Sequence, residues 1–139
     1  SGAKRFQKDV LRLEPDLITI DYGRNDMFLT EEEMRMAWES MIRAAHQKNI
    51  KVLLITPAAD SGAIYYEPEK RKLTDQQMAE IIRELAEEYG TGLADAEAVF
   101  EDLFAHGHRR SEYAASVNHP NRRGHEIVAD CLAEWFPYC

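Results

Sequence analysis

The sequence predicts an α/β protein with a parallel sheet that helices cover on both faces. Short, continuous apolar segments over residues 17–22, 51–56 and 92–96 are typical of buried parallel strands. The segments between them carry apolar residues at helical spacing. Only three such strands are visible, whereas a sheet usually has about five or six. We therefore expect one α/β domain over residues 1–139 that lacks strands on its amino-terminal side.

Two capping boxes mark the beginnings of helices. Thr30 is followed three residues later by Glu33, and Thr74 is followed in the same way by Gln77. In such a pair the threonine hydroxyl accepts from the third helical N–H, and the side-chain oxygen of the Glu or Gln accepts from the threonine backbone N–H. An apolar stripe follows each box, and Gly90 predicts the end of the second of these two helices.

Three further helices are expected, over residues 3–14, 98–105 and 120–135. Trp135 belongs to the apolar face of the last one and is expected to face inward. A long loop runs from residue 58 to residue 73. Loops of that length usually carry function or are disordered, so this segment is a candidate for substrate contacts.

Charge and hydropathy exclude some partners. The formal net charge is −8 and the sequence pI is about 5.1. Nucleic-acid binding needs a concentrated basic face, so no nucleic-acid partner is expected. No apolar segment approaches the ~20 residues of a membrane span, and no signal peptide is visible. That favours the cytoplasm, but the chain starts at Ser1 without a methionine, so localisation stays open.

Polar residues follow the first predicted strand, in the order Gly23-Arg24-Asn25-Asp26. Open α/β sheets bind ligands outside the carboxyl ends of their strands. An asparagine amide at such a strand end can donate a hydrogen bond to the oxyanion of ester hydrolysis. These four residues are also good turn formers, so for the tetrapeptide alone both interpretations stay open.

A second polar element precedes the last predicted helix. It reads Ser116-Val117-Asn118-His119-Pro120-Asn121-Arg122-Arg123-Gly124-His125. Pro120 keeps His119 out of helical geometry, so the imidazole is expected to project over the helix start into the crevice at the strand ends. A neutral imidazole there can act as a general base. Alternatively, Asn118 and His119 are only capping and turn residues.

The two elements together resemble the SGNH hydrolases, also called GDSL-type esterases and lipases. The family's third block, Gly-x-Asn-Asp, matches residues 23–26, and its last block, Asp-x-x-His-Pro-Asn-x-x-Gly-His, matches residues 116–125. The resemblance covers essentially the whole chain. It implies a flavodoxin-like three-layer αβα sandwich and a serine ester hydrolase. The implied substrate is a small ester or acylated molecule, and no metal or organic cofactor is implied.

The resemblance also implies roles for individual residues. His119 would take the proton of a nucleophilic serine, and Asn25 would donate to the oxyanion. Supporting or substrate-binding roles would fall to Gly23, Arg24, Asp26, Ser116 and Asn118.

Two departures from the family pattern bear on activity. The Gly-Asp-Ser block and the glycine block after it do not occur, so the nucleophile and one oxyanion donor are expected to lie outside this chain. Ser116 stands where the family usually has the carboxylate that orients the histidine. The Ser116 hydroxyl or a backbone carbonyl could hold the ring, Glu112 could swing in from the preceding loop, or activity could be low.

A second functional class therefore stays open beside the esterase. The same fold could be a non-catalytic binding or interaction module. The serine at position 116, in place of the family's carboxylate, would then be a sign of lost catalysis. A truncated sheet would also expose a strand edge through which a homo-oligomer could form. The identity of the ester is left open by the resemblance, because specificity lies in loops such as residues 58–73.

The chain's histidines fit no standard zinc spacing, so no metal is expected.

Overall fold

A parallel sheet forms the centre of the computed structural model. The structure describes residues 2–59, 70–116 and 119–136. The sheet has three strands in the order β1 (Leu17–Ile20), β2 (Lys51–Ile55) and β3 (Gly92–Ala94). Both neighbouring pairs are parallel, so the carboxyl ends of all three strands lie at one edge of the sheet. This confirms the predicted α/β class with a parallel sheet.

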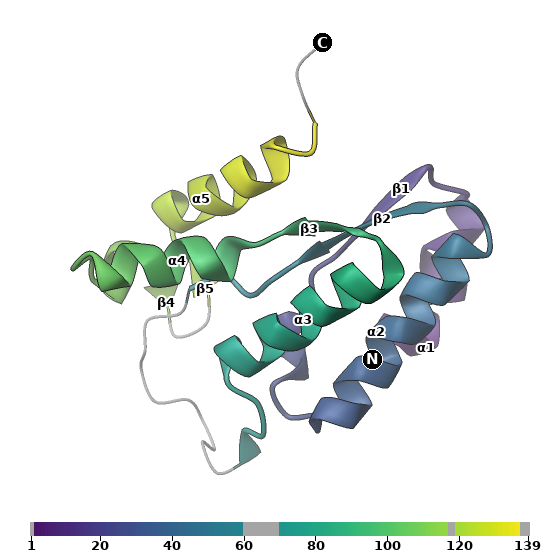
Figure 1. Ribbon diagram of the computed structural model, residues 1–139, viewed down its shortest axis with the longest axis horizontal. Helices are drawn as coiled ribbons and strands as arrows, with labels where there is room; N and C mark the ends of the chain where they lie inside the picture. Colours follow the sequence, from purple (N-terminus) through teal and green to yellow (C-terminus); the bar gives the residue numbers. More distant parts are fainter. Residues whose placement is uncertain (1, 60–69, 117–118, 137–139) are drawn as a thin grey trace.

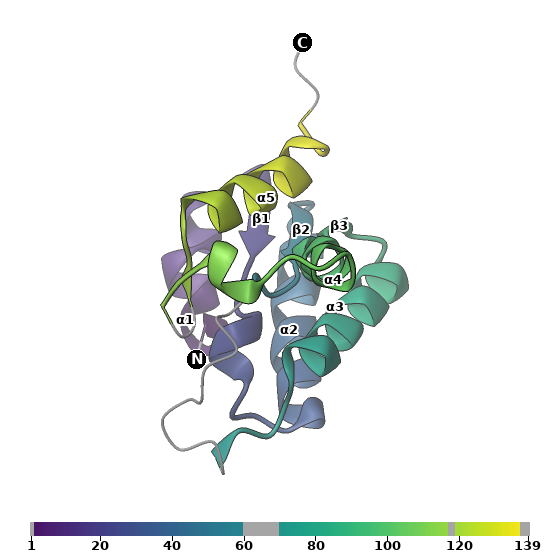
Figure 2. The same ribbon diagram turned by 90° about the vertical axis from the view of Figure 1, so that its left-hand side faces the viewer.

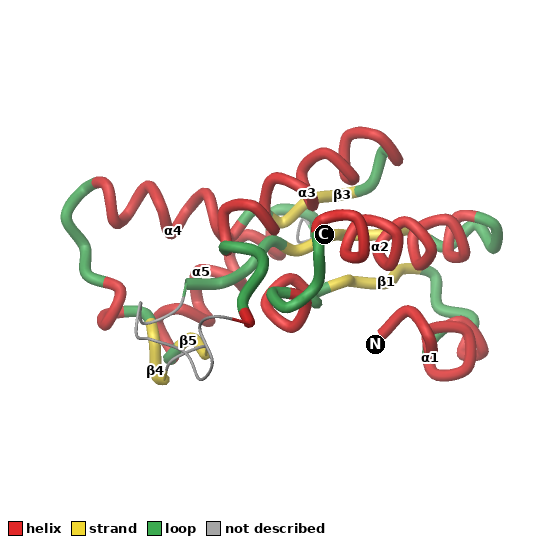
Figure 3. The backbone as a smooth tube through the Cα atoms, turned by 90° about the horizontal axis from the view of Figure 1, so that it is seen from below, coloured by secondary structure: helices red, strands yellow, loops and turns green. Residues whose placement is uncertain are grey.

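Helices lie on both faces of this sheet. They are α1 (Gly2–Asp9), α2 (Glu31–His46), α3 (Asp75–Tyr89), α4 (Ala96–Ala105) and α5 (Arg122–Ala133). With the strands seen nearly end-on, α2 and α3 lie on one side of the sheet and α5 on the other (Figure 2). Seen from below, α1 lies beside β1 at the end of the strand order (Figure 3). The arrangement is the three-layer αβα sandwich that the sequence predicts.

The alternation of side chains along the strands explains the two layers. Ile18 and Ile20 of β1 belong to the apolar cluster that α1, α2 and α3 share, with Trp38 fully buried in it. Leu53 of β2 points to the opposite face and packs in a second cluster with Phe100 of α4 and with α5. Because successive strand residues face opposite sides, one short apolar strand can serve both clusters.

The capping boxes are present as predicted. The Thr30 hydroxyl accepts from the Glu33 N–H at the start of α2, and the Thr74 hydroxyl accepts from the Gln77 N–H at the start of α3. Gly90 ends α3 in the left-handed conformation, with φ at 61°. This conformation favours a residue without a Cβ, so glycine is a common end signal for a helix.

Several predicted boundaries were wrong by a few residues. The helix expected over residues 3–14 ends at Asp9, and a separate 3₁₀ turn, η1 (Leu11–Leu13), follows it. The short helix α4 begins at Ala96, two residues before its predicted start, because Asp95 caps it by accepting from the Ala98 N–H. Trp135, predicted to face inward, is 50% exposed.

A short antiparallel ribbon is the feature that the sequence interpretation missed. Strands β4 (Ala114–Ser116) and β5 (His119–Pro120) pair with each other beside the carboxyl end of the main sheet (Figure 1). These two strands are short and include the polar residues Ser116 and His119, so they have too little hydrophobic pattern to be recognised from sequence. The last helix consequently begins at Arg122 rather than at Pro120, with Asn121 as its cap.

No helix in the described ranges is long and apolar enough to cross a bilayer.

Candidate active site

The loop after β1 packs closely against the end of β2. It forms a short 3₁₀ helix, η2 (Gly23–Asp26), in which the Asn25 N–H donates to the Tyr22 carbonyl over 2.8 Å. A Cβ on Gly23 would lie 2.8 Å from the Pro57 Cγ, closer than such atoms approach in proteins. Glycine is therefore required here for the close approach, and the tight turn leaves Asn25 exposed at the carboxyl edge of the sheet.

Arg24 ties this loop to its neighbours. Its guanidinium donates to the Ala58 carbonyl at 2.7 Å and to the Asp75 carboxylate at 3.0 Å. Ala58 lies in the segment after β2, and Asp75 is the first residue of α3. Arg24 thus joins three segments at the carboxyl edge, which fits the predicted supporting role and restrains the position of Asn25.

Asp26 also supports the loop from the side of the core. The Trp38 indole N–H donates to the Asp26 carboxylate over 2.8 Å. Burial raises the pKa of Asp26 above its ordinary value, although the hydrogen bond from Trp38 acts in the opposite direction. Asp26 does not line the cavity described next, so it holds η2 against α2 and does not face a ligand.

Asn25 and His119 line one small cavity although they are far apart in the sequence. The cavity has a volume of about 260 Å³. Its lining comes from the segment directly after β1, η2, the segment after β2, β5 and α5, and consists of Asp21, Arg24, Asn25, Pro57, Ala58, His119, Pro120, His125 and Val128. The structure therefore brings the two candidate catalytic residues together at the edge where open α/β sheets bind ligands.

The β4–β5 ribbon and the helix cap hold His119. Asn121 donates from its backbone to the Tyr113 carbonyl at 2.8 Å and from its side chain to the Glu112 carbonyl at 2.9 Å. Its side-chain oxygen accepts from the Gly124 N–H at 3.1 Å and caps α5. These bonds anchor the Asn121 end of the His-Pro-Asn segment, and the pairing of β5 with β4 holds the His119 end, where the side chain is exposed. Asn118, a predicted supporting residue, lies outside the described residues.

Sequence reasoning missed two ionisable residues that line the cavity. Asp21 comes directly after β1 and is exposed at the cavity rim, yet enough protein surrounds its carboxylate to desolvate it. This desolvation raises the pKa of Asp21, and the positive charge of Arg24 opposes the rise. The position of Asp21 at a strand end is the signal that could have found it. The second residue, His125, is exposed and lines the cavity from α5.

The structure places the Glu112 carboxylate away from the role considered for it. The carboxylate accepts from the Arg109 N–H at 2.9 Å, lies 3.6 Å from the His108 Nδ1 and forms an ion pair with Arg123 at 3.6 Å. The backbone hydrogen bond from Arg109 lowers the pKa of Glu112, and the charge of His108 adds to this effect. Glu112 is therefore engaged with other groups and does not orient His119.

No serine of the described ranges lines the cavity. The Ser40 hydroxyl donates to the Ala37 carbonyl on α2, and Ser111 lies in the 3₁₀ turn η4 (Arg110–Glu112). Ser1 and Ser61 lie outside the described residues, as do Tyr65 and Tyr66 of the long loop. Over the described part of the chain, no three His, Cys, Asp or Glu side chains gather as metal ligands.

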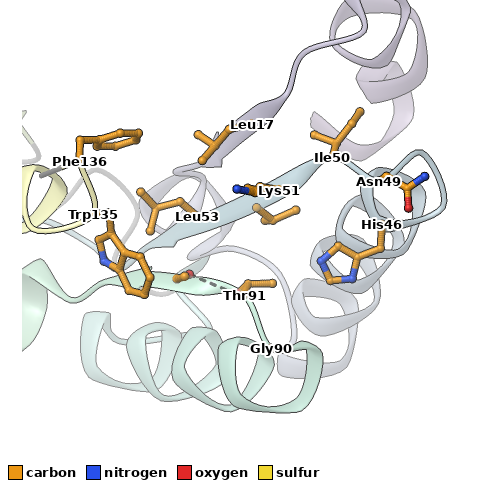
Figure 4. Close-up of a pocket in the computed structure, with 12 residues that line it drawn as sticks. Leu17, His46, Asn49, Ile50, Lys51, Leu53, Gly90, Thr91, Trp135 and Phe136 are labelled. Atoms are coloured by element: carbon orange, nitrogen blue, oxygen red, sulfur yellow. Dashed lines mark hydrogen bonds between the residues drawn. The ribbon is translucent and has the colours of Figure 1, made fainter. Parts of the chain in front are cut away.

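A larger cavity lies at the opposite edge of the sheet. It has a volume of about 730 Å³ and lies where the strands begin, between Leu17 and Leu53 on one side and Trp135 and Phe136 on the other (Figure 4). Neither Asn25 nor His119 reaches it. Because the ligand edge of an open α/β sheet is the carboxyl one, the smaller cavity is the better candidate for an active site.

We expect Gly124→Ala to destabilise the protein although alanine is the better helix former. In a helix interior, replacing glycine by alanine usually stabilises the helix by up to about 1 kcal/mol. At Gly124, however, a Cβ would overlap the Tyr113 carbonyl oxygen and lie 2.7 Å from the Pro120 Cβ. Such overpacking typically costs about 1–3 kcal/mol, so urea unfolding should show a net loss. A gain in stability would contradict the close packing of α5 on the ribbon.

The fold and this cavity together define a class of protein. A parallel α/β sheet places Asn25 and His119 in one cavity at its carboxyl edge, the edge at which open α/β sheets bind ligands. Residues 1–127 match the sequence model of the GDSL-like Lipase/Acylhydrolase family, and the chain belongs to that family. By family it is a carboxylic ester hydrolase.

Solved structures support the assignment of the fold. An acetyl xylan esterase is 23% identical in sequence, with a TM-score of 0.77. The match covers 96% of this chain and 73% of the esterase chain. A catalytic mutant of an acetylxylan esterase from Geobacillus stearothermophilus is 19% identical, with a TM-score of 0.77. That match covers 99% of this chain and 67% of the mutant chain. The lipase/acylhydrolase from Enterococcus faecalis is 25% identical, with a TM-score of 0.75. Its match covers 97% of this chain and 68% of the Enterococcus chain. No curated protein matches the sequence significantly.

Proposed function

We propose that this chain provides the general base and an oxyanion donor of a serine esterase that removes short acyl groups. The observation that carries the proposal is the common cavity of Asn25 and His119 at the carboxyl edge of the sheet. Family membership supports an ester hydrolase, and the geometry supplies a histidine and an amide that can serve one reaction centre.

Acetyl esters of carbohydrates are the substrate class that we favour. The cavity, at about 260 Å³, is below the roughly 300–1,000 Å³ of typical small-molecule sites, which suits a short acyl group better than a long one. Its rim carries Asp21, Arg24 and His125, polar groups that can hydrogen-bond to hydroxyls of a sugar. Two proteins of similar fold are acetyl xylan esterases.

The proposed reaction has two steps. A serine hydroxyl from outside the described residues attacks the ester carbonyl while His119 takes its proton, and His119 then gives the proton to the departing alcohol. The Asn25 amide donates to the oxygen that becomes negative in the tetrahedral intermediate. A water molecule, deprotonated by His119, then attacks the acyl-enzyme, and His119 returns the proton to the serine oxygen as the acid is released.

Asn25→Ala is expected to lower kcat for p-nitrophenyl acetate by on the order of 10²–10³-fold, because one oxyanion donor is lost. KM should change little, since the oxyanion forms only after binding. Asn25→Asp is a matched variant of nearly the same shape. It should lower kcat at least as much, because a carboxylate cannot donate and repels the oxyanion.

The measurement uses the full-length protein and includes a fluorophosphonate probe that labels activated serines. Labelling together with hydrolysis of acetylated xylo-oligosaccharides is the expected result. If no serine is labelled and no ester is turned over, the esterase proposal fails and the non-catalytic module becomes the better explanation. Turnover that Asn25→Ala leaves unchanged would contradict the role of Asn25.

A further inference from the structure

Ser116 lies directly beside the imidazole of His119. The Ser116 Oγ is 3.5 Å from the His119 Nδ1, at the long limit of a hydrogen bond. Ser116 does not line the cavity, whereas His119 does. The serine therefore contacts the ring from outside the cavity, at Nδ1, the ring nitrogen bonded to Cγ.

The ribbon pairing is what makes this contact. In the antiparallel ladder, Ser116 is the partner of His119, and Ala114 is the partner of Pro120. The register shifts between Ala114 and Ser116, so β4 has one more residue than the matching part of β5. Such a bulge re-aims a side chain. Without the shift, Ala115 would be the partner of His119, and no hydroxyl would reach the ring.

Other groups do not replace Ser116 in the described part of the chain. The two histidine–carboxylate contacts there join His106 to Asp102 and His108 to Glu112, and neither involves His119. The Glu112 carboxylate is held by Arg109, His108 and Arg123. The hydroxyl of Ser116 is consequently the side-chain group in hydrogen-bonding range of the His119 Nδ1.

We infer that Ser116 is a positioning residue that accepts a hydrogen bond from the His119 Nδ1–H and so leaves Nε2 free to act as the base. A hydroxyl performs this role more weakly than a carboxylate would. It can accept from Nδ1–H, but it can also donate to an unprotonated Nδ1, which places the proton on Nε2. A carboxylate only accepts, and therefore favours a single tautomer. The inference deepens the proposed function and rests on it for its effect on rate.

The test replaces Ser116 by aspartate and by alanine. An aspartate is one bond longer than serine, so its oxygen can close the gap to the roughly 2.7–2.9 Å of a charge-assisted hydrogen bond. Ser116→Asp should raise kcat about tenfold or more, since loss of a triad carboxylate costs up to about 10⁴-fold. The acidic limb of the kcat profile should also move to higher pH, because the carboxylate stabilises the imidazolium. Ser116→Ala should lower kcat a fewfold with KM nearly unchanged.

The His119 ring tautomer is a second readout that needs no turnover. Nitrogen-15 chemical shifts of the two ring nitrogens distinguish the Nδ1–H form from the Nε2–H form. Ser116→Asp should increase the Nδ1–H fraction and Ser116→Ala should decrease it. Ala115→Asp is the matched control, because it adds the same charge on the same strand but outside the His119 pair, and should leave the tautomer ratio as in the wild type.

The outcomes separate this inference from the proposed function. If no variant turns over ester but the tautomer ratio follows Ser116, the esterase proposal fails and the positioning contact stands. If the tautomer ratio is the same in Ser116→Asp, Ser116→Ala and wild type, the inference is overturned even when the protein is an active esterase. Fluorophosphonate labelling of Ser116 itself would also overturn it, because that result would make Ser116 the nucleophile.

Discussion

His119→Ala is expected to lower kcat for p-nitrophenyl acetate by on the order of 10⁴–10⁶-fold, the range seen when the histidine of a serine hydrolase is removed. The physical reason is that the nucleophilic hydroxyl then has no base in reach and the leaving alkoxide receives no proton. His119 is exposed on a ribbon that backbone pairing with β4 and the Asn121 hydrogen bonds hold in place. Its truncation should therefore leave the folded structure intact, as circular dichroism can verify.

His125→Ala is the control for this prediction. His125 lines the same cavity from α5 and has the same chemistry, but it lies outside the His-Pro-Asn ribbon. A decrease in kcat of less than about tenfold is expected, which corresponds to less than about 1.4 kcal/mol of transition-state stabilisation. An equal loss in both variants, or a larger loss in His125→Ala, would show that the base has been assigned to the wrong histidine.

Arg83→Met should cause a large loss of stability although Arg83 lies outside the cavity. The Arg83 guanidinium donates to both Asp95 carboxylate oxygens at 2.7 and 2.9 Å and to Glu97 at 2.6 Å. The Glu97 side chain is only 9% exposed, so the variant leaves a largely buried carboxylate without its cation. Removing one partner of a fully buried pair costs about 3–5 kcal/mol, and for this partly exposed cluster we expect about 2–3 kcal/mol by urea unfolding at pH 7.

The pH dependence of this loss follows from Asp95. Desolvation alone would raise the pKa of Asp95, but the hydrogen bonds from Arg83 and Thr56 and the charge of Arg83 outweigh it and lower the pKa below its ordinary 3.8. A depressed folded-state pKa stabilises the protein above the unfolded value and loses that effect as the pH falls through the folded value. The stability difference between wild type and Arg83→Met should therefore shrink as the pH falls below about 4. A constant difference would contradict the electrostatic explanation.

Arg35→Met is a matched control for Arg83→Met. The side chains of both arginines are 31% exposed, and both donate to two carboxylates. The partners of Arg35, however, are Glu84 and Glu88 on the surface of α3, with Glu84 64% exposed. Exposed ion pairs contribute about 0–1 kcal/mol, so this variant should lose no more than that. If the two variants lose equal stability, burial of the partners does not determine the effect.

The sequence by itself determined the α/β class, the three parallel strands and the beginnings of α2 and α3. These features depend on local signals. Each strand is a continuous apolar segment. Helices α2 and α3 each begin after a threonine whose hydroxyl accepts a hydrogen bond from a backbone N–H of the first turn. The assignment of Asn25 and His119 to a single site depended on two motifs and their resemblance to a family. Spacing alone does not show that two residues so far apart face one cavity.

Only the tertiary structure decided how the site is held together. The β4–β5 ribbon, the tie from Arg24 to Asp75 and the presence of Asp21 at the cavity rim all depend on contacts between segments that are distant in the sequence. A two-residue strand has no hydrophobic period to recognise, and the partner of a charged side chain is not encoded in its neighbours. The hydroxyl of Ser116 reaches His119 because a bulge in the ribbon sets the register, and register is a property of the paired strands.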